Sequence, residues 1–398
     1  MKKEDYLKAF ASDTKNWSFN FAPGRIEFLG NHLDYNGGDV LGMAVDAGIY
    51  CLGIPHFEKQ SLGISEGGNQ FSLFSESFEN AQLSSFLGNI ERQSGKFAWT
   101  NYCLGVLKEL QERDLAPCEG FRLIFTSNLP TSVGLSSSAA LELASALTLL
   151  QLAGKSLPTF ELASLCRAAE NKFVGLPCGI LDQGTSAFGK KDHLVHIDCD
   201  KEIFSNLPIP SDTQVWIFNT GIKHDLVDSL YSTRHQECLD ALKVGKKKYP
   251  EKNKLTDFTL DEIELLGLPD NLKKRAIHVC NEQTRVNQFK EGLASNLSAE
   301  DLGKLLVKSH ESSSTYFENS CKELDFLAEN LNQLPGVLGA RLTGGGFGGA
   351  VMAWTRSTFN EKDANGITSK YKEEFDKDIE HHHFLPSDGA RKEELLKK

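Results

Sequence analysis

The sequence lacks long apolar runs, paired cysteines and an excess of positive charge. Its 398 residues contain no apolar stretch long enough to span a membrane, which takes about 20 residues in succession. The N-terminal segment MKKEDYLKAF has two lysines directly after Met1 but no apolar run behind them, so we expect no secretory signal. The nine cysteines form no C-x-x-C pair, a pattern typical of reduced thiols rather than of disulfides or a zinc site. Together these absences predict a cytoplasmic protein without a membrane partner.

Basic residues are the minority among the charged ones. There are 43 Lys and Arg against 54 Asp and Glu, which gives a formal net charge of −11. Nucleic acids bind basic faces, so we expect no nucleic-acid partner, although a local pocket can still hold a small anion. The chain of 398 residues also exceeds the roughly 250–300 residues at which a single core stops growing. We therefore predict two domains with the active site between them. The sequence carries no signal for the oligomeric state and is compatible with a monomer.

Hydrophobic periodicity indicates an α/β chain whose character changes near residue 200. Before that point, helical spacing predicts helices over 99–113, 137–152 and 159–173, and alternation predicts a strand over 121–126 and short strands within 18–54. After it, a strand over 214–219 precedes helix-rich segments at 227–247, 270–293 and 300–333, and a strand pair flanks the glycines at 344–349. We place the boundary there, which gives domains 1–200 and 201–398.

A run of three histidines, His381–His383, stands near the end of the sequence. Three adjacent residues cannot all face one ion from a regular element. We therefore expect a solvated segment rather than a metal site.

The sharpest motif is LPTSVGLSSSAA at residues 129–140. Gly134 precedes three serines at the start of a predicted helix, where backbone N–H groups are unpaired and carry partial positive charge. Small side chains let phosphate oxygens approach that backbone, and serine hydroxyls can ligate Mg²⁺. Three serines on their own are more often a helix cap, so the motif gains its meaning only in combination with others.

A second motif, RLTGGGFGGAV at residues 341–351, has five glycines within six residues. Gly344, Gly346 and Gly349 satisfy G-x-G-x-x-G, but the sequence after them indicates a strand, whereas a dinucleotide-binding motif precedes a helix. No H-R-D or D-F-G motif supports a protein kinase. The motif therefore predicts a turn whose backbone is approached closely by another group.

A third cluster, PGRIEFLGNHLDYNGG at residues 23–38, gathers Arg, His, Asp, Asn and Tyr around a turn. Donors and acceptors together suit the vicinal hydroxyls of a sugar. An ordinary polar loop would explain any one of these residues, but the cluster as a whole favours a sugar site.

These three clusters, in this order and spacing, resemble the three motifs of the GHMP kinase superfamily. GRIEFLGNHLDYNGG is similar to the galactokinase signature, GLSSSAALELA to the phosphate-binding motif, and LTGGGFGG to the third motif. Segments between Ala169 and Gln183 and around Tyr231 are also family-like, so the resemblance covers nearly the whole chain. It implies an N-terminal domain with a mixed sheet and a C-terminal domain with an antiparallel sheet and helices, with the active site between them.

The resemblance also implies a reaction, phosphorylation of the anomeric C1 hydroxyl of galactose by ATP to give galactose 1-phosphate and ADP. Asp182 would be the general base or would orient that hydroxyl, and Arg25 beside it would favour the ionised carboxylate and stabilise the transferring phosphoryl group. Ser138 and Glu170 would hold Mg²⁺. The residues implied in sugar binding are Asn31, His32, Asp34, Gly179 and Tyr231. Those implied in ATP binding are Gly134, Leu135, Ser136, Ser137, Ser138 and Ala139.

Asn31 departs from the family pattern. Galactokinases typically carry glutamate there, and its carboxylate accepts a hydrogen bond from the C6 hydroxyl of the sugar. Such a bond to a charged group contributes roughly 1.5–3 kcal/mol, enough to change the preferred sugar. Galactose remains the predicted substrate, and a sugar altered at C6, such as galacturonate, is the alternative. A sugar- and ATP-sensing binding protein is a second alternative, which the presence of Arg25 and Asp182 disfavours because a sensor needs neither.

Overall fold

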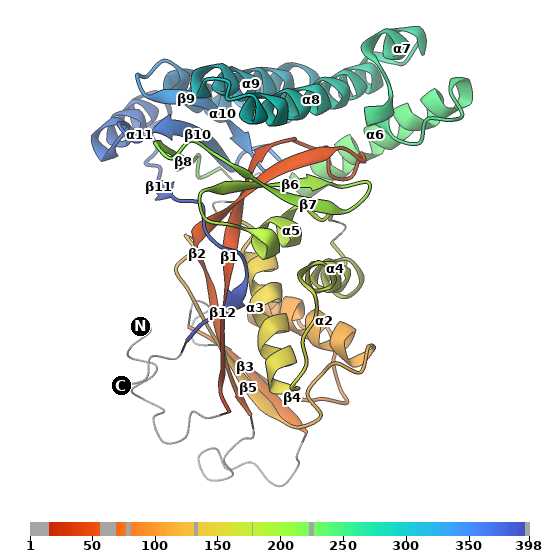
Figure 1. Cartoon of the computed structure of the whole chain (residues 1–398), viewed down its shortest axis with the longest axis vertical. Helices are drawn as coiled ribbons and strands as arrows, with labels where there is room; N and C mark the ends of the chain where they lie inside the picture. Colours follow the sequence, from red (N-terminus) through yellow and green to blue (C-terminus); the bar gives the residue numbers. More distant parts are fainter. Residues whose placement is uncertain are drawn as a thin grey trace.

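The structure, a computed structural model, describes residues 16–55, 69–76, 81–130, 134–176, 178–222 and 227–394, with the side chains of 227–229 excepted. Residues 131–133 of the predicted phosphate motif therefore lie outside the described residues. The described part of the chain forms two β-sheets, each covered by helices (Figure 1). None of its helices combines the length and the apolar character that crossing a membrane requires.

The first sheet has eight strands and is mixed. Its order is β12-β1-β2-β5-β3-β4, and β6 joins it by pairing with β2 and β7. The pair β3 and β5 is parallel and the other pairs are antiparallel. The strands are β1 (Ser18–Leu29), β2 (Asp39–Pro55), β3 (Gln70–Ser75), β4 (Ala81–Phe86), β5 (Phe121–Ser127), β6 (His193–Asp198), β7 (Ile203–Pro208) and β12 (Arg391–Lys392).

Helices cover one face of this sheet (Figure 1). They are α2 (Thr100–Gln111), α3 (Ser137–Leu152), α4 (Thr159–Ala169) and α5 (Leu181–Phe188), with the short turns η1 (Gly95–Phe97) and η2 (Glu170–Val174). Helix α3 has the predicted bounds because it is rich in Ala and Leu, which favour helices. It packs on β1 and β2 and therefore brings the serines at its start to the middle of the sheet.

The second sheet has four antiparallel strands in the order β11-β8-β10-β9. These are β8 (Thr213–Asn219), β9 (Val337–Thr343), β10 (Ala350–Arg356) and β11 (His381–Phe384). Helices α9 and α10 pack on β9, and this sheet with its helices forms the upper part of Figure 1. The helices of this part are α6 (Val227–Lys248), α7 (Leu260–Leu265), α8 (Asp270–Ala294), α9 (Ala299–Ser312), α10 (Lys322–Asn332) and α11 (Glu361–Phe375), with the turns η3 (Leu255–Asp257) and η4 (Ser313–Phe317). A mixed N-terminal sheet and an antiparallel C-terminal sheet confirm the predicted fold class.

The predicted boundary at residue 200 does not coincide with the division between the sheets. Strand β7 continues the first sheet by pairing with β6, and β12 returns from the C-terminal end to pair with β1. Residue 200 lies in the turn between β6 and β7, and β7 is largely exposed. The change in composition near residue 200 therefore falls within a solvated hairpin of the first sheet.

Two predicted segments also differ from the structure. The helical segment 300–333 is interrupted after η4, where Glu318 adopts a left-handed conformation with φ of 55°. The histidine run is a regular element, because His381–Phe384 form the edge strand β11 on β8, where the ring of His383 stacks on Trp216. Its three histidines are nevertheless accessible to solvent, and His383 is exposed. Among the described residues, no group of three His, Cys, Asp or Glu side chains is placed to hold a metal ion.

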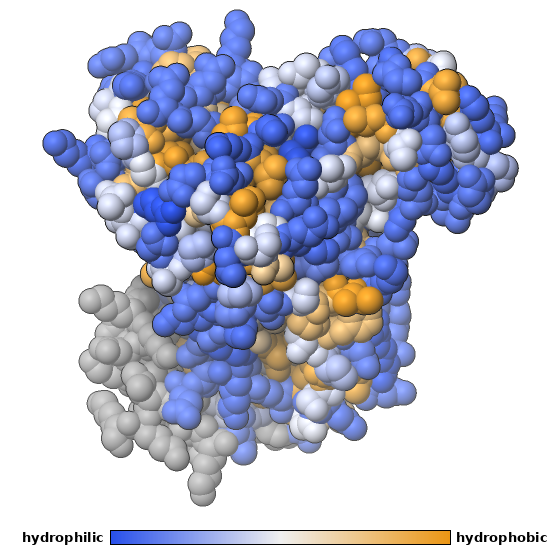
Figure 2. Space-filling model, turned by 45° about the horizontal axis from the view of Figure 1, so that its top comes forward, coloured by the Kyte–Doolittle hydropathy of each residue, from blue (hydrophilic) through white to orange (hydrophobic). Residues whose placement is uncertain are grey.

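Strands β1 and β9 join the two sheets. Arg341 on β9 donates to the Phe28 carbonyl at 3.1 Å, and the Thr343 hydroxyl donates to the Glu27 carbonyl at 3.0 Å. Hydrophilic side chains predominate on the outer face drawn in Figure 2, and apolar residues lie there in separate patches. The junction of β1 and β9 thus brings the buried polar residues Glu27, Arg341 and Thr343 together.

Candidate active site

Two adjoining cavities lie at the junction of the sheets. The larger, of about 470 Å³, is lined by the phosphate motif from Gly134 to Ser138 and by aromatic residues that include Trp99 and Tyr102. The smaller, of about 190 Å³, is lined by polar side chains that include His32, Asp34 and Asp182. Arg25, Gly344 and Gly345 line both cavities. A group transferred from one cavity to the other would therefore pass Arg25.

Asp182 and Arg25 form an ion pair at this passage. Asp182 lies in the first turn of α5, and its Oδ1 accepts from the Arg25 Nε at 2.7 Å and lies 2.6 Å from Nη2. The other carboxylate oxygen accepts from the Ser136 hydroxyl. Arg25 also donates through Nη1 to the Gly134 carbonyl at 2.8 Å, so one arginine connects the carboxylate to the phosphate motif. The structure thus brings together the two residues predicted to be catalytic.

The start of α3 forms the wall of the larger cavity. Gly134 has φ of 72° and Ser136 has φ of 49°, both in the left-handed region. These angles turn the chain into the helix and leave Ser137 exposed and Ser138 partly accessible, whereas Ala139 is buried. Ser136 lines the cavity and its hydroxyl donates to Asp182, so this residue connects the motif to the Arg25–Asp182 pair. Of the residues predicted to bind ATP, those from Gly134 to Ser138 line this cavity, and Ala139 does not.

The smaller cavity is lined by four of the five residues predicted to bind sugar, namely His32, Asp34, Gly179 and Tyr231. His32 stacks on Phe317 with ring centroids 4.2 Å apart, and its Nδ1 lies 3.0 Å from the Tyr35 hydroxyl. Burial lowers the pKa of His32 well below its usual value, so its ring is neutral. Tyr231 lies 5.4 Å from His32, ring to ring. A methyl group added to Gly179 would lie 2.3 Å from the Asp34 carboxylate, which explains why glycine occupies that position.

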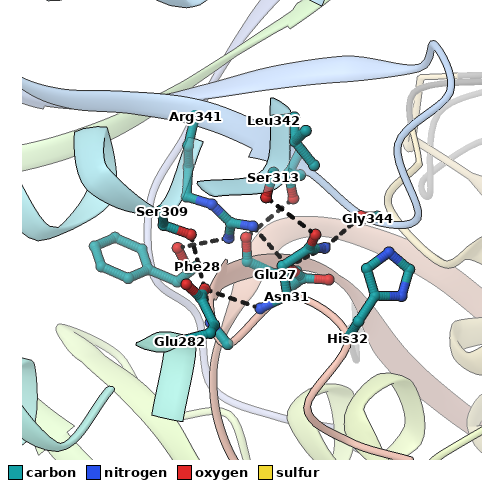
Figure 3. A network of polar contacts seen from close by, with 12 residues as sticks. Glu27, Phe28, Asn31, His32, Glu282, Ser309, Ser313, Arg341, Leu342 and Gly344 are labelled. Atoms are coloured by element: carbon teal, nitrogen blue, oxygen red, sulfur yellow. Dashed lines mark hydrogen bonds and ion pairs between the residues drawn. The ribbon is translucent and has the colours of Figure 1, made fainter. Parts of the chain in front are cut away.

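Asn31 does not present its side chain to the smaller cavity. It is fully buried, and its amide donates to Glu27 Oε1 at 3.0 Å and to the Gly344 carbonyl at 2.9 Å. Its Oδ1 accepts from Ser313 at 3.3 Å (Figure 3) and from Asn319 at 3.0 Å. These contacts use both the donor and the acceptor capacity of the amide, so Asn31 holds the turn together.

Two buried carboxylates lie behind Asp182. The amide of Gln183 donates to Glu170 Oε2 at 2.7 Å and to Glu142 Oε2 at 3.0 Å. Burial, with repulsion from Asp182, raises the pKa of Glu170. Burial, with repulsion from Glu170, raises the pKa of Glu142 well above its usual value. Within the described residues Glu142 Oε1 has no hydrogen-bond partner, so this cluster would be stabilised by a nearby cation.

Three acidic residues of the site were not predicted from the sequence. Glu142 is the one charged residue of the apolar helix α3, a signal that could have revealed it. Glu27 lies within the sugar cluster. A charged residue between buried neighbours on β1 is the signal that could have revealed it. Glu282 on α8 accepts from the backbone N–H groups of Gly30 and Asn31 at 3.0 and 3.1 Å, and no local pattern indicates that contact.

Comparisons with known proteins agree with this geometry. The model described as GHMP kinases N terminal domain matches residues 101–190, the one described as GHMP kinases C terminal matches 290–377, and the galactokinase galactose-binding signature matches 4–55. The galactokinase of Thermotoga neapolitana is 37% identical over 373 residues, which cover 93% of this chain and 99% of that protein. The galactokinase of Mannheimia succiniciproducens is 36% identical, over 89% of this chain and 90% of its own length.

Solved structures show the same relationship. The crystal structure of Lactococcus lactis galactokinase complexed with galactose has a TM-score of 0.88 at 30% identity and covers 98% of each chain. The mevalonate kinase of Methanococcus jannaschii has a TM-score of 0.64 at 19% identity, a likeness of fold alone. The two sheets and the serine-rich helix start at their junction define a kinase of the GHMP superfamily. Within it, the chain belongs to the galactokinase family, whose members phosphorylate galactose, and the predicted family and enzyme class are confirmed.

Proposed function

We propose that the chain transfers the γ-phosphoryl group of ATP to the C1 hydroxyl of galactose, giving galactose 1-phosphate and ADP in the cytoplasm. The observation that carries this proposal is the Arg25–Asp182 pair at the point where the two cavities meet. ATP fits the larger cavity, because its wall is a helix start with small residues. Galactose fits the smaller one, whose donors and acceptors alternate around a confined space.

In this arrangement Asp182 accepts a hydrogen bond from the C1 hydroxyl and receives its proton as the phosphoryl group transfers. Arg25 pairs with the Asp182 carboxylate and faces the negative charge of the transferring group. His32, Asp34 and Tyr231 hold the sugar ring. Gly179 has no side chain and therefore leaves room for the Asp34 carboxylate. Phosphoryl transfer needs mainly positioning and electrostatic stabilisation, and these residues supply both.

Mg²⁺ is expected with ATP, and the residues present fit it. Mg²⁺ prefers carboxylate and hydroxyl oxygens, and Ser138 lines the larger cavity while Glu170 lies in the carboxylate cluster behind Asp182. The pKa of Glu170, which burial and Asp182 raise, would fall beside a cation. When bound, the ion would neutralise charge on the β- and γ-phosphates. Ser138 and Glu170 would hold it.

Replacement of Asp182 by asparagine tests the proposal. We expect Asp182→Asn to lower kcat for ADP formation by roughly 10²- to 10⁴-fold, the usual contribution of a general base, while ATP affinity measured by calorimetry stays near that of the unaltered chain. The matched control is Asp192→Asn, because Asp192 is exposed and should tolerate the change. Unchanged turnover in Asp182→Asn would remove this residue from the mechanism. An unaltered chain that binds both ligands without forming ADP would be a sensor.

A further inference from the structure

Glu27 is a buried carboxylate that lines the smaller cavity. Its Oε1 accepts from Asn31 Nδ2 and from Arg341 Nη2, each at 3.0 Å (Figure 3). Within the described residues no hydrogen bond reaches Oε2. One carboxylate oxygen is thus fixed by the protein, and the other remains for a ligand.

The side-chain amide of Asn31 donates to the Glu27 carboxylate, so the residue types at positions 27 and 31 must match. Asn31 Nδ2 faces two acceptors, Glu27 Oε1 and the Gly344 carbonyl, and Oδ1 faces two donors. A carboxylate at position 31 would face both acceptors and would be repelled by Glu27. Glu27 and Asn31 therefore form a matched pair in which the charge belongs to position 27.

The place of Glu27 on β1 determines which part of a sugar it faces. Arg25 and Glu27 are two residues apart on a regular stretch of β1, so their side chains share a face and are separated by about 7 Å. The C1 hydroxyl lies at Arg25 and Asp182 in the proposed function. Glu27 then faces a part of the sugar away from C1. It also contacts Asn31 at 3.0 Å, the residue from which a contact to the C6 hydroxyl was expected.

We propose that Glu27 is the specificity-determining residue that accepts a hydrogen bond from the C6 hydroxyl of galactose, and that Asn31 is a positioning residue for Glu27. This inference rests on the proposed function for the orientation of the sugar. It also predicts that uronates are rejected, because Glu27, Asp34 and Asp182 all line the cavity and a C6 carboxylate would be repelled. Galacturonate, the alternative suggested by Asn31 alone, is thereby disfavoured.

The test compares galactose with 6-deoxygalactose and galacturonate. In the unaltered chain we expect calorimetry to show galactose binding roughly 10- to 100-fold more tightly than 6-deoxygalactose, the value of a hydrogen bond to a charged group. In Glu27→Gln this ratio should fall several-fold, and galacturonate should bind better relative to galactose. The matched control is Glu291→Gln, the same change at an exposed position of α8 that lines neither cavity, so its ratio should match that of the unaltered chain.

An exchange of the two residues separates a cavity role from a purely structural one. Asn31→Glu alone should lose galactose binding, because two carboxylates would meet. Glu27→Asn combined with Asn31→Glu restores a single carboxylate and should recover both binding and the preference for galactose over 6-deoxygalactose. Recovery supports the matched pair, and a double variant no better than Asn31→Glu contradicts it.

Affinity and turnover decide different questions. ADP formation with galactose tests the proposed function, whereas the ratio of sugar affinities tests Glu27 even in a chain that turns over slowly. A folded Glu27→Gln protein, judged by its thermal unfolding, that keeps the full preference for galactose over 6-deoxygalactose would overturn the inference and leave the proposed function intact.

Discussion

Asp34 lies in the smaller cavity near two other carboxylates, Glu27 and Asp182. Burial, followed by repulsion from Glu27 and Asp182, raises the pKa of Asp34 to about 7. An ionised Asp34 therefore costs folding free energy in the empty cavity. A sugar that donates hydroxyl hydrogen bonds to this carboxylate would favour its charged form. The ionised form of Asp34 is therefore more favourable with a sugar bound than without one.

Replacement of Asp34 by asparagine should show this cost as a pH dependence. The folded-state pKa is raised, so the stability contributed by protonated Asp34 is fully present below pH 3.8 and is lost as the pH rises through about 7. Asparagine does not titrate. We therefore expect Asp34→Asn to raise the unfolding temperature, relative to the unaltered chain, more at pH 8 than at pH 5. Thermal unfolding without ligand measures both, with Asp114→Asn at an exposed position as control. An equal difference at the two pH values would contradict the assigned cause.

At the scale of elements, helix α8 supports the sugar-binding turn from behind. Glu282 accepts from the N–H groups of Gly30 and Asn31, from the Ser309 hydroxyl at 2.7 Å and from Arg285 Nε at 2.6 Å. One turn earlier, His278 Nε2 lies 3.2 Å from the Asn31 carbonyl. Arg285, Arg341 and His278 hold the pKa of Glu282 far below its usual value despite complete burial, so the carboxylate remains charged.

Glu282→Gln should therefore weaken the fold and the sugar site together. An amide cannot accept from all four donors, and breaking a buried ion pair costs about 3–5 kcal/mol. We expect a lower denaturant midpoint and a higher KM for galactose, with little change in KM for ATP. The exposed Glu291 lies on the same helix, so Glu291→Gln is the control and should behave like the unaltered chain. An equal rise in both KM values would show that α8 does not act through the sugar turn.

Sequence patterns predicted the elements that local chemistry determines. Helix α3 was predictable because Ala and Leu favour helices over its whole length, and β9 and β10 were predictable because a glycine turn separates two apolar runs. The break after η4 was not, because Asn319 is buried by its contacts with Asn31, His32 and Gly345, and such distant contacts override helical periodicity. For the same reason the residue types around the sugar turn indicated a sugar site, whereas the engagement of Asn31 and the support from Glu282 did not follow from them.

At the scale of the whole molecule, each cavity takes walls from both sheets. Arg25 and Glu27 come from β1 in the first sheet, and Gly344 and Gly345 follow β9 in the second. Gly345 leaves room for Tyr231, whose ring would lie 3.3 Å from an added methyl group. A bound ligand therefore contacts both sheets at once, and binding should stabilise their junction as well as the cavity.

Removal of Mg²⁺ should separate the contributions of the two cavities. Ser138 lines the larger cavity and not the smaller, so chelation with EDTA should abolish ADP formation and leave galactose binding in place. Galactose at 100 times its Kd should still stabilise the fold by about 2.7 kcal/mol, seen as a rise in unfolding temperature with or without EDTA. Added Mg²⁺ should restore turnover. Loss of the galactose-induced rise in EDTA would instead mean that a metal completes the sugar site, because the residues of the smaller cavity would then be insufficient to hold the sugar between the two sheets.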